Sequence, residues 1–303
     1  MSCLVKGSPK VNSGFPFRHL NCGLPTDKVC PNMVHPIFTA VDCHAHVIAK
    51  DRPITTHRHQ PPERDYTAAE LLANFDSVGV SHGVLTAPSY YLNDNSLLLE
   101  ALAASSRLRG TVNLAPDTSV EEMVALREKG VCGVRLNWYR KPALPDIREQ
   151  RDLMARIRDA GLHLEMFIEG QHLPAVLPAI EQSGVKLVLD HFGCPDPDGG
   201  VRSAGFVKML DLMNRGRAWV KLSAPYRLQE KDFETHARTY ARAMLSGAGP
   251  QQLVWASDWP WGAHEEGMTY DRCIDWLADW VPEAAARQHI LSVTPVSLFR
   301  FDT

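Results

Sequence analysis

The sequence predicts a single (β/α)8 barrel of the TIM type over residues 37–303, preceded by an irregular N-terminal arm over residues 1–36. The chain has 303 residues and is 45% hydrophobic, which suffices for one barrel or two smaller domains. A strand-like run is followed by a helix-like run eight times, with no linker between the units. Several strand-like runs are continuously apolar, as expected for parallel strands that are buried on both faces.

Each unit can be placed from its apolar pattern and its turn residues. The expected strands are 37–45, 80–88, 108–116, 131–138, 162–170, 186–193, 217–225 and 252–261. The expected helices are 67–79, 93–106, 119–130, 146–161, 173–184, 203–216 and 231–247, followed by helical sequence to the C-terminus. Two of these helices open with the pattern of a capping box, Thr67 with Glu70 and Ser119 with Glu122.

The composition favours a small-molecule partner. The formal net charge is only -3 with both signs interspersed, so no surface for nucleic acid or an anionic membrane is indicated. No apolar run is long enough to cross a bilayer, and the N-terminus lacks a secretion signal, so we expect a cytoplasmic protein. Seven cysteines without a CxxC pair indicate neither a disulfide framework nor a zinc knuckle. The sequence leaves open whether copies form a homo-oligomer.

Polar residues gather where the strands are expected to end, which is where TIM barrels carry their catalytic groups. These residues are Asp42, His44, His46, Arg135, Asn137, Glu169, Asp190, His191, Lys221, Ser223 and Asp258. In the stretch VDCHAHVIAK, the first three are spaced two apart, and such side chains share a face of a regular strand. We therefore expect Asp42, His44 and His46 to point one way and Val41 and Cys43 the other.

Several of these residues also have a plainer interpretation. An isolated His-x-His pair occurs often by chance. Arg135 could pair with a strand-end acid, and Asp190 could bond backbone or a neighbouring Lys or Arg. Trp259 and Trp261 would ordinarily pack in the core, although they flank Asp258 closely enough to wall a pocket. Their position at the strand ends of an eight-unit repeat favours a functional site.

Three motifs together resemble the amidohydrolase superfamily: HxH ending the first strand, DHFGCPD at the sixth and WASDWPW at the eighth. Within it, the branch of 2-pyrone-4,6-dicarboxylate lactonase and related sugar and muconate lactonases looks closest. The resemblance implies that Asp258 is the general base and that His44, His46 and His191 polarise a lactone carbonyl. It also implies that Arg135 binds a substrate carboxylate, and that the pathway degrades aromatic or sugar acids. In metal-dependent relatives the strand-one pair matches metal ligands.

Two departures from that branch bear on the substrate. The chain has Cys194 where the pyrone lactonase has an arginine, and Phe167 where it has a tyrosine. A lost guanidinium weakens the case for a dicarboxylate, because bidentate recognition of carboxylate by arginine is difficult to replace. We expect an anionic lactone other than the pyrone itself. The expected substrate-binding residues are Arg135, Asn137, Arg227, Lys141 and Trp259, with Arg140 as a further anion contact.

The need for a metal is left open by the sequence. A mononuclear zinc site takes three or four protein ligands, and His44, His46 and Asp258 would supply three. Glu169 or His172 would have to supply a fourth. No candidate for a carbamylated lysine ends the fourth strand, so a binuclear centre is not expected. The sequence favours a site that needs no cofactor, or that holds one Zn or Mn ion weakly.

Three functions remain to be compared. The preferred one is a lactonase, in which water activated by Asp258 opens the C–O ester bond. The alternative is a zinc-dependent non-oxidative decarboxylase acting on an aminocarboxymuconate-like acid, which would require the metal. The third is a barrel that only binds a partner, but its reactive positions are all filled, and the site rather than the fold decides function.

Overall fold

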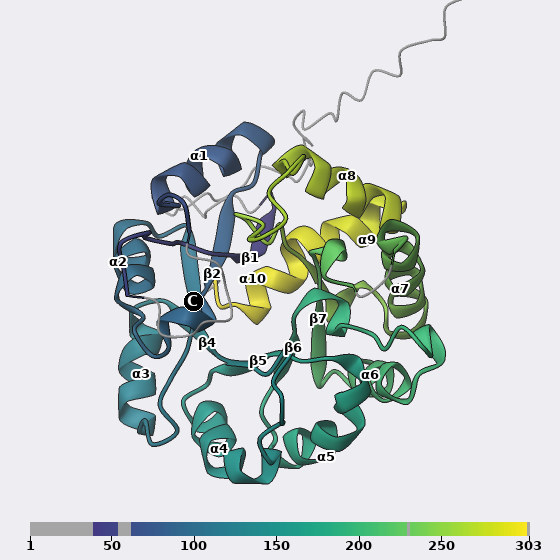
Figure 1. The fold of residues 1–303 in the computed structure, drawn as a ribbon, viewed down its shortest axis with the longest axis horizontal. Helices are drawn as coiled ribbons and strands as arrows, with labels where there is room; N and C mark the ends of the chain where they lie inside the picture. Colours follow the sequence, from purple (N-terminus) through teal and green to yellow (C-terminus); the bar gives the residue numbers. More distant parts are fainter. Residues whose placement is uncertain (1–38, 54–61, 229–230, 302–303) are drawn as a thin grey trace, which may run out of the picture. The chain divides into compact units, whose positions relative to one another are not determined.

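The protein is described here by a computed structural model that covers residues 39–53, 62–228 and 231–301. Eight parallel strands pair in chain order, from β1 to β8, and alternate with helices that form an outer ring (Figure 1). The strands are β1 Val41–Ala45, β2 His82–Thr86, β3 Leu108–Val112, β4 Val131–Asn137, β5 His163–Phe167, β6 Leu187–Leu189, β7 Ala218–Leu222 and β8 Leu253–Trp255. The predicted TIM barrel is confirmed. The predicted arm, residues 1–36, lies outside the described residues and stays a prediction.

The ring helices follow the strands in the predicted order. They are α1 Ala68–Val78, α2 Ser96–Ala104, α3 Val120–Glu128, α4 Arg151–Asp159, α5 Leu173–Ser183, α6 Ala204–Asn214, α7 Phe233–Ala248 and α8 Tyr270–Trp280. Two short helices, α9 Ala284–Gln288 and α10 Thr294–Leu298, follow α8 and are joined by a π-helical turn, His289–Val293. In the part of the chain that is described, no helix is long and apolar enough to cross a membrane.

The two predicted capping boxes form to different extents. Ser119 and Glu122 bond reciprocally at the start of α3, so this box is complete. Thr67 accepts a hydrogen bond from the Glu70 amide at 3.1 Å, as predicted. The Glu70 carboxylate, however, accepts two hydrogen bonds from Arg64, both of 2.8 Å, instead of returning to the Thr67 amide. A charged partner competes better for a carboxylate than a backbone amide does.

The barrel closes between β1 and the segment that follows β8. Ala45 bridges Trp259 in parallel, and the His46 amide donates to the Trp259 carbonyl at 2.8 Å. The Asp258 amide donates to the His44 carbonyl at 2.9 Å. These bonds bring the two ends of the described sheet together, and they set the strand-one histidines beside Asp258.

One end of the barrel is filled by the C-terminal segment. Inward-facing strand residues such as Val84 and Val254 form a buried apolar cluster with Leu298, Phe299 and Phe301. The Phe299 ring meets His163 edge-on at 5.4 Å, inside the barrel. We call this cluster the floor. The candidate catalytic residues named above lie toward the opposite end, the mouth, where the strands finish.

β1 contains a β-bulge, and Asp42 therefore points in a different direction from the one predicted. Asp42 pairs with Gly83, but Ala45 pairs with Leu85. Between these two pairs β1 advances by three residues and β2 by two, so β1 contains one extra residue. Cys43 consequently packs in the floor cluster, whereas Ala45 packs in the outer core with the helices. Asp42 points away from the imidazoles, and the expectation that it shares their face is wrong.

Asp42 instead fastens β1 to the segment after β8 and to α8. Its carboxylate accepts hydrogen bonds from the Ser257 amide at 2.9 Å, the Ser257 hydroxyl at 2.5 Å and the Tyr270 hydroxyl at 3.0 Å. It also accepts from the His44 amide at 3.2 Å. Burial raises the pKa of Asp42, and the bonds from Ser257 oppose that rise. The residue thus holds the backbone of the site rather than an imidazole.

Candidate active site

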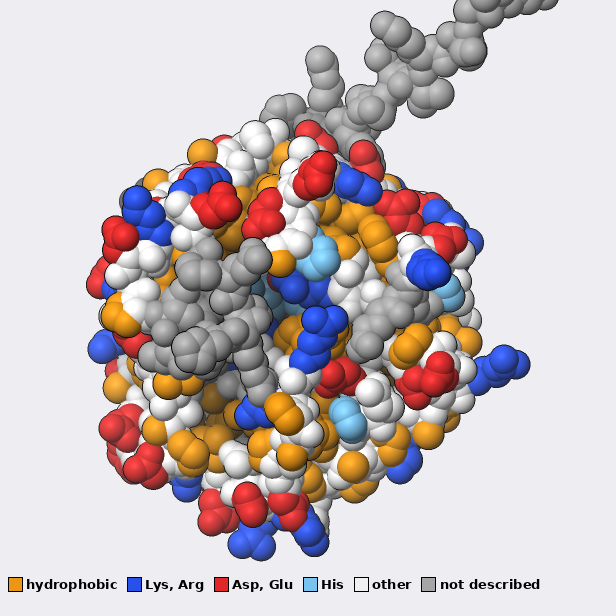
Figure 2. Space-filling view, viewed as in Figure 1, with side chains coloured by type: hydrophobic (Ala, Val, Ile, Leu, Met, Phe, Trp, Pro, Cys, Tyr) orange, Lys and Arg blue, Asp and Glu red, His pale blue; other side chains and the backbone are white. Residues whose placement is uncertain are grey.

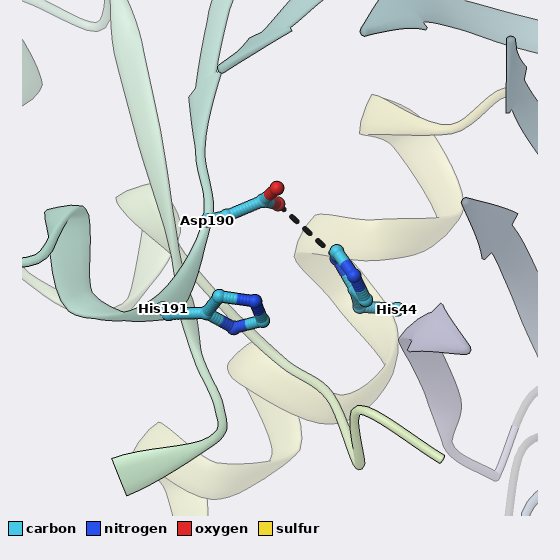
Figure 3. A group of neighbouring side chains, drawn as sticks. All are labelled: His44, Asp190 and His191. Carbon is cyan, nitrogen blue, oxygen red and sulfur yellow. Dashed lines mark hydrogen bonds and ion pairs between the residues drawn. The ribbon is translucent and has the colours of Figure 1, made fainter. Parts of the chain in front are cut away.

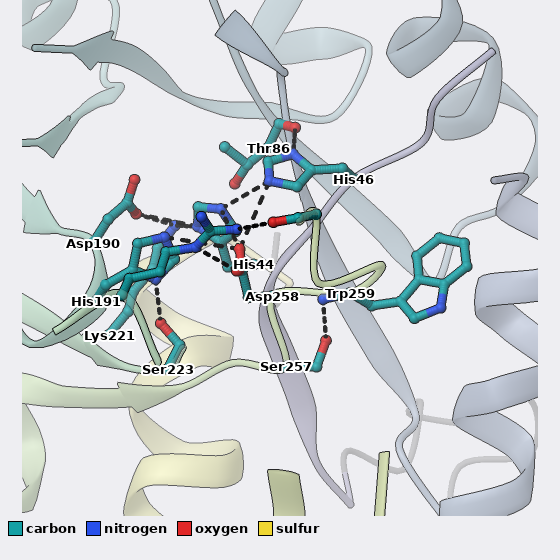
Figure 4. Close-up of polar contacts among 12 residues, drawn as sticks. His44, His46, Thr86, Asp190, His191, Lys221, Ser223, Ser257, Asp258 and Trp259 are labelled. Carbon is teal, nitrogen blue, oxygen red and sulfur yellow. Dashed lines mark hydrogen bonds and ion pairs between the residues drawn. The ribbon is translucent and has the colours of Figure 1, made fainter. Parts of the chain in front are cut away.

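Four predicted catalytic side chains converge at the mouth of the barrel (Figure 4). The Nε2 atoms of His44, His46 and His191 lie 3.5, 3.8 and 3.7 Å from Asp258 Oδ1. Asp258 Oδ1 is buried and has no hydrogen-bond partner within the described structure. One carboxylate oxygen therefore faces three imidazole nitrogens across a space that a small reactant atom or an ion can enter.

The backbone at two of these residues is unusual. Asp258 has φ 61° and His191 has φ 49°, both in the left-handed region that non-glycine residues rarely adopt. His191 opens the short 3-10 helix η4, His191–Gly193, immediately after β6. Such conformations cost on the order of 1–3 kcal/mol and are found preferentially at functional sites. Here they turn both side chains back over the barrel mouth.

The second oxygen of Asp258 is held by two donors from η6, Pro225–Arg227. The Tyr226 hydroxyl and Arg227 Nε donate to Asp258 Oδ2 at 2.9 and 2.8 Å. Burial alone would raise the pKa of Asp258, but Arg227 and the three imidazoles outweigh it and hold the pKa far below its usual range. Asp258 is therefore ionised, and its orientation is fixed so that Oδ1 faces the histidines.

The proton positions on the strand-one histidines follow from their partners. His46 Nδ1 lies 2.7 Å from the Thr86 carbonyl, an acceptor, so this nitrogen carries the proton. Burial and the neighbouring His44 lower the pKa of His46 to about 3, so its ring is neutral and Nε2 is a lone pair. The 3.2 Å contact between the two Nε2 atoms is then a hydrogen bond donated by His44. In that arrangement His44 Nδ1 accepts from Lys221 Nζ at 3.0 Å.

His191 completes the trio from the other side of the mouth. Its ring centroid lies 4.9 Å from that of His44, and its Nδ1 is 2.9 Å from the Ser223 hydroxyl. Burial lowers the pKa of His191 well below its ordinary value, so this ring too is neutral. The serine hydroxyl can donate or accept, which lets His191 present either a proton or a lone pair at Nε2.

A buried ion network lies beneath His44. Asp190 Oδ1 approaches His44 Nδ1 at 3.1 Å (Figure 3), and Asp190 Oδ2 accepts from Arg135 Nη2 at 3.0 Å. Lys221 Nζ lies 2.5 Å from Glu165 Oε2 and 3.1 Å from Asp190 Oδ1. Two cations face two anions, and none of the four has more than a few per cent of its side chain exposed. The charges of these four side chains therefore balance one another.

The shifted pKa values in this network correspond to ionised Asp190, Glu165 and Lys221. Burial opposes ionisation of Asp190, but Lys221, His44 and Arg135 together pull its pKa well below the usual range. Burial and Asp190 act to raise the pKa of Glu165, but Lys221 and other partners lower it to about 2. Burial acts to lower the pKa of Lys221, but its two carboxylate partners raise it. The ionised forms therefore stabilise one another.

Arg135 and Asp190 are paired with each other, in agreement with the plainer interpretation of the sequence. Arg135 is 5% exposed and is held by Asp190 and by the Ala87 carbonyl at 3.3 Å. Its contacts give no support to the predicted binding of a substrate carboxylate, because its charge is already neutralised. Asp190 bonds a lysine and an arginine, as the alternative foresaw, and it also reaches His44.

The other predicted substrate-binding residues are placed differently. Asn137 is the last residue of β4, and its Oδ1 accepts from the Tyr139 amide at 3.2 Å, in the loop that follows. Lys141 lies in that loop. The Trp259 ring is 2% exposed and packs on Tyr66 at 5.6 Å, so this tryptophan lies in the core rather than along a pocket wall. Arg227 remains in reach of the mouth, with 21% of its side chain exposed.

Two sets of side chains could hold a metal ion in the described part of the chain: His44, His46 and Asp258, and His44, Asp190 and His191. Glu169 and His172, the predicted fourth ligands, belong to neither set. The Glu169 carboxylate accepts a hydrogen bond from the Arg140 amide at 2.8 Å. In the second set, Asp190 already contacts two cations, Arg135 and Lys221. The first set fits one divalent ion better, because the unbonded Asp258 Oδ1 faces the Nε2 lone pair of His46.

Sequence reasoning missed three contributors. Glu165 is a buried acid in the otherwise apolar strand HLEMF, and its two-residue spacing from His163 and Phe167 marks an inward-facing row. Tyr226 directly precedes Arg227 and bonds the proposed base. Thr86 acts through its backbone carbonyl, which no side-chain motif could have indicated.

An aromatic wall borders the imidazoles. Phe167 meets His191 edge-on at 4.9 Å and stacks on Tyr139 at 4.2 Å. The Arg140 guanidinium lies over the outer ring of this stack, 5.2 Å from the Tyr139 centroid. Figure 2 shows that histidine and Lys or Arg surface gathers around the hollow at the centre of this face. The mouth therefore combines a flat apolar side with cationic groups.

Comparisons with known proteins agree with this geometry. A 2-pyrone-4,6-dicarboxylate hydrolase of Comamonas testosteroni is 28% identical over 86% of this chain and 90% of its own length. A 4-sulfomuconolactone hydrolase of Hydrogenophaga intermedia is 25% identical over 85% of this chain and 88% of its own length. A crystal structure from Pseudomonas putida, described as a 2-pyrone-4,6-dicarboxylic acid hydrolase, superposes with a TM-score of 0.81 at 34% identity. It covers 88% of this chain and 99% of that one.

The decarboxylases of the alternative hypothesis are more distant. A 5-carboxyvanillate decarboxylase of Sphingomonas paucimobilis is 13% identical with a TM-score of 0.61, a likeness that shows the fold alone. The family model for amidohydrolases matches residues 41–301, which span the whole described barrel. The predicted hydrolase class is confirmed, and the chain belongs to the amidohydrolase family.

Proposed function

We propose that this protein hydrolyses a lactone that carries an anionic group. The observation that carries the proposal is the unbonded, buried Oδ1 of Asp258, which faces the Nε2 atoms of three imidazoles. Lactone hydrolysis needs a base for water and donors for the growing charge on the carbonyl oxygen, and this cluster contains both. Two relatives are named for lactones that bear acid groups, a pyrone dicarboxylate and a sulfomuconolactone.

Asp258 acts as the general base. Its Oδ1 removes a proton from a water molecule, and the water oxygen bonds to the lactone carbonyl carbon as the carbonyl π electrons move to oxygen. When the tetrahedral species collapses, the ring C–O bond breaks and Asp258 returns its proton to the leaving oxygen. The products are a hydroxyl group, or its keto tautomer, and a carboxylic acid that ionises and releases its proton to solvent. The ionised state of Asp258 in the resting site suits it to the first of these steps.

The histidines divide the remaining work. When substrate and water bind, they replace the hydrogen bond between the Nε2 atoms of His44 and His46. His44 and His191 then present N–H groups to the carbonyl oxygen, His44 because Lys221 donates to its Nδ1. His46 has its proton on Nδ1 and therefore presents a lone pair, so it orients the attacking water instead of polarising the carbonyl. This assignment changes the role that the family resemblance implied for His46. Lys221 becomes a positioning residue, since it sets which nitrogen of His44 carries the proton.

A divalent ion fits the same cluster, held by His44, His46 and Asp258. When bound, it would supply Lewis-acid activation of the lactone carbonyl. His44 would then donate from Nδ1 to Asp190 at 3.1 Å and offer its Nε2 lone pair. The residues can therefore serve either scheme, and the two schemes differ in the proton position on His44.

Arg227 and Arg140 are the proposed contacts for the substrate anion. Arg227 has 21% of its side chain exposed beside Asp258, and Arg140 lies over the aromatic wall. We prefer them to Arg135, which bonds Asp190 and has only 4% of its side chain exposed. A planar lactone lying against Phe167 would place an acid group within reach of the two exposed guanidiniums.

Hydrolysis of a panel of carboxylated and sulfonated lactones tests the proposal. Acid release by the wild type would be compared with Asp258→Asn and with Asp279→Asn, a control at an exposed carboxylate that pairs with Arg238. We expect Asp258→Asn to lose about 10²–10⁴-fold in kcat and the control to be unchanged. Equal activity of Asp258→Asn and wild type would refute the role of the base.

The same panel, repeated after chelation, decides between the two schemes. Activity that survives removal of metal supports the scheme in which Lys221 donates to His44 Nδ1 and His44 donates from Nε2. Activity that is lost and then restored by Zn or Mn supports a bound ion. Failure of the wild type on every lactone, with CO2 release from a muconate-type acid, would replace the lactonase by the decarboxylase.

A further inference from the structure

A second cavity lies at the floor end of the barrel, away from the imidazoles. Its volume is about 470 Å³, within the usual range for sites that hold small molecules. It opens between the starts of β3 and β4 and the ends of α2 and α3, and the C-terminal segment forms one side. Neither the proposed reaction nor the family resemblance involves these residues.

The charged lining of this cavity is dominated by cations. Arg109, Arg127, Lys129 and Arg300 line it, and Glu128 is the acid among the lining residues. None of the ion pairs between described residues includes Arg109, Arg127 or Lys129. Elsewhere on the surface, arginines such as Arg64 and Arg215 pair with acids.

Backbone carbonyls hold the arginines in place and leave part of each guanidinium free. Arg109 donates from Nε to the Arg300 carbonyl at 3.3 Å and from Nη1 to the Leu108 carbonyl at 3.0 Å. Arg127 donates from Nη1 to the Ala160 carbonyl at 2.9 Å. The described contacts of these two arginines leave both Nη2 groups without an acceptor. Burial and the nearby Arg300 lower the pKa of Arg109, as expected for a cation that lacks a counter-charge.

Local dipoles do not cancel this charge. The C-terminal ends of α2 and α3 contribute about half a negative charge each, and Glu128 contributes one more. Set against Arg109, Arg127 and Lys129 alone, these negative charges leave the cavity with roughly one positive charge. Guanidinium groups bind carboxylate and phosphate oxygens in pairs, with geometry that a lone chloride cannot satisfy.

We propose that this floor cavity binds a small molecule with at least two oxyanion groups, either phosphate or carboxylate. The ligand would tie the C-terminal segment to α2 and α3, because the lining comes from all three. Its binding is therefore expected to stabilise the folded barrel. The proposal is independent of the reaction at the mouth.

Calorimetric titration and thermal unfolding with pyrophosphate and with citrate, at constant ionic strength, test the proposal. Arg127→Gln and Lys129→Gln remove cavity charges at partly or fully exposed side chains, so both variants should fold. Arg151→Gln is the matched control, since this exposed arginine lies on α4 outside the cavity. Arg140→Gln serves to detect binding at the mouth instead, because Arg140 is a proposed anion contact there.

We expect saturable binding of at least one probe and a rise of several degrees in Tm at 100 times Kd. Each cavity variant should weaken binding by about tenfold, with no change in Arg151→Gln or Arg140→Gln. Binding of pyrophosphate alone would assign a phosphorylated ligand, and binding of citrate alone a polycarboxylate. The proposal fails if neither probe saturates, if the cavity variants bind like the control, or if Arg140→Gln abolishes binding.

Discussion

Removal of the Lys221 ammonium tests the buried ion network most directly. In Lys221→Met, a side chain of similar length loses its charge while Glu165 and Asp190 keep theirs. Lys221 Nζ lies 2.5 and 3.1 Å from these carboxylates, and all three side chains are 0% exposed. At an effective dielectric constant of about 20, each contact is worth about 5–7 kcal/mol before desolvation. Desolvation offsets much of that, so we expect a loss of about 3–5 kcal/mol in the free energy of unfolding.

A double-mutant cycle separates the lost attraction between Lys221 and Glu165 from the cost of leaving the Glu165 carboxylate buried without that partner. Glu165→Gln alone leaves Lys221 paired with Asp190. The double variant Lys221→Met/Glu165→Gln leaves one ion pair, between Arg135 and Asp190. The double variant should therefore be destabilised by less than the sum of the single changes, by at least about 1 kcal/mol. Urea unfolding followed by circular dichroism gives all four free energies. Strict additivity would refute the described coupling.

The network also predicts how stability depends on pH. The pKa of Glu165 is lowered from 4.5 to about 2 in the folded protein. A depressed carboxylate pKa stabilises the fold above the unfolded value, and this stabilisation is lost as the pH falls from about 4.5 to 2. Wild type should lose more stability over this interval than Glu165→Gln. Parallel curves for the two proteins would contradict the role given to Glu165.

Three further results are expected. Because the pKa of His46 is about 3, that of His191 is well below its ordinary value and Asp258 is ionised, kcat should stay flat as the pH falls through 6.5; a decrease with a midpoint near 6.5 would contradict the neutral state of His46 and His191. Phe299→Ala should reduce the free energy of unfolding by about 3–5 kcal/mol, measured by urea unfolding, because this ring is 0% exposed in the floor. Ser119→Ala should cost about 1 kcal/mol through its complete capping box, and more than Thr67→Ala, whose box is half formed; the reverse order would be unexpected.

The sequence predicted the barrel because eight units repeat a pattern that depends only on local periodicity. It also predicted the meeting of His44, His46, His191 and Asp258, because strand ends in a barrel converge whatever the details of packing. These conclusions needed only the order of the elements.

What the sequence could not provide were the partners inside the mouth. Arg135 resembles an anion-binding arginine until Asp190 is seen at 3.0 Å. The orientation of Asp42 depends on a bulge, which one extra residue produces without any composition signal. Trp259 is drawn into the core by Tyr66, a residue nearly two hundred positions away. Each outcome is set by tertiary contacts that no window along the chain contains.

The way in which the barrel closes also constrains how the chain is made. β1 leaves the ribosome early, but the segment that bridges it carries Asp258 and Trp259, and the floor needs Phe299 and Phe301. Until these residues emerge, the nascent sheet has an open edge at β1 and an unfilled apolar interior. The catalytic cluster therefore cannot assemble during most of translation. Synthesis should therefore pass through an unclosed state that exposes apolar strand surface until the C-terminal segment emerges.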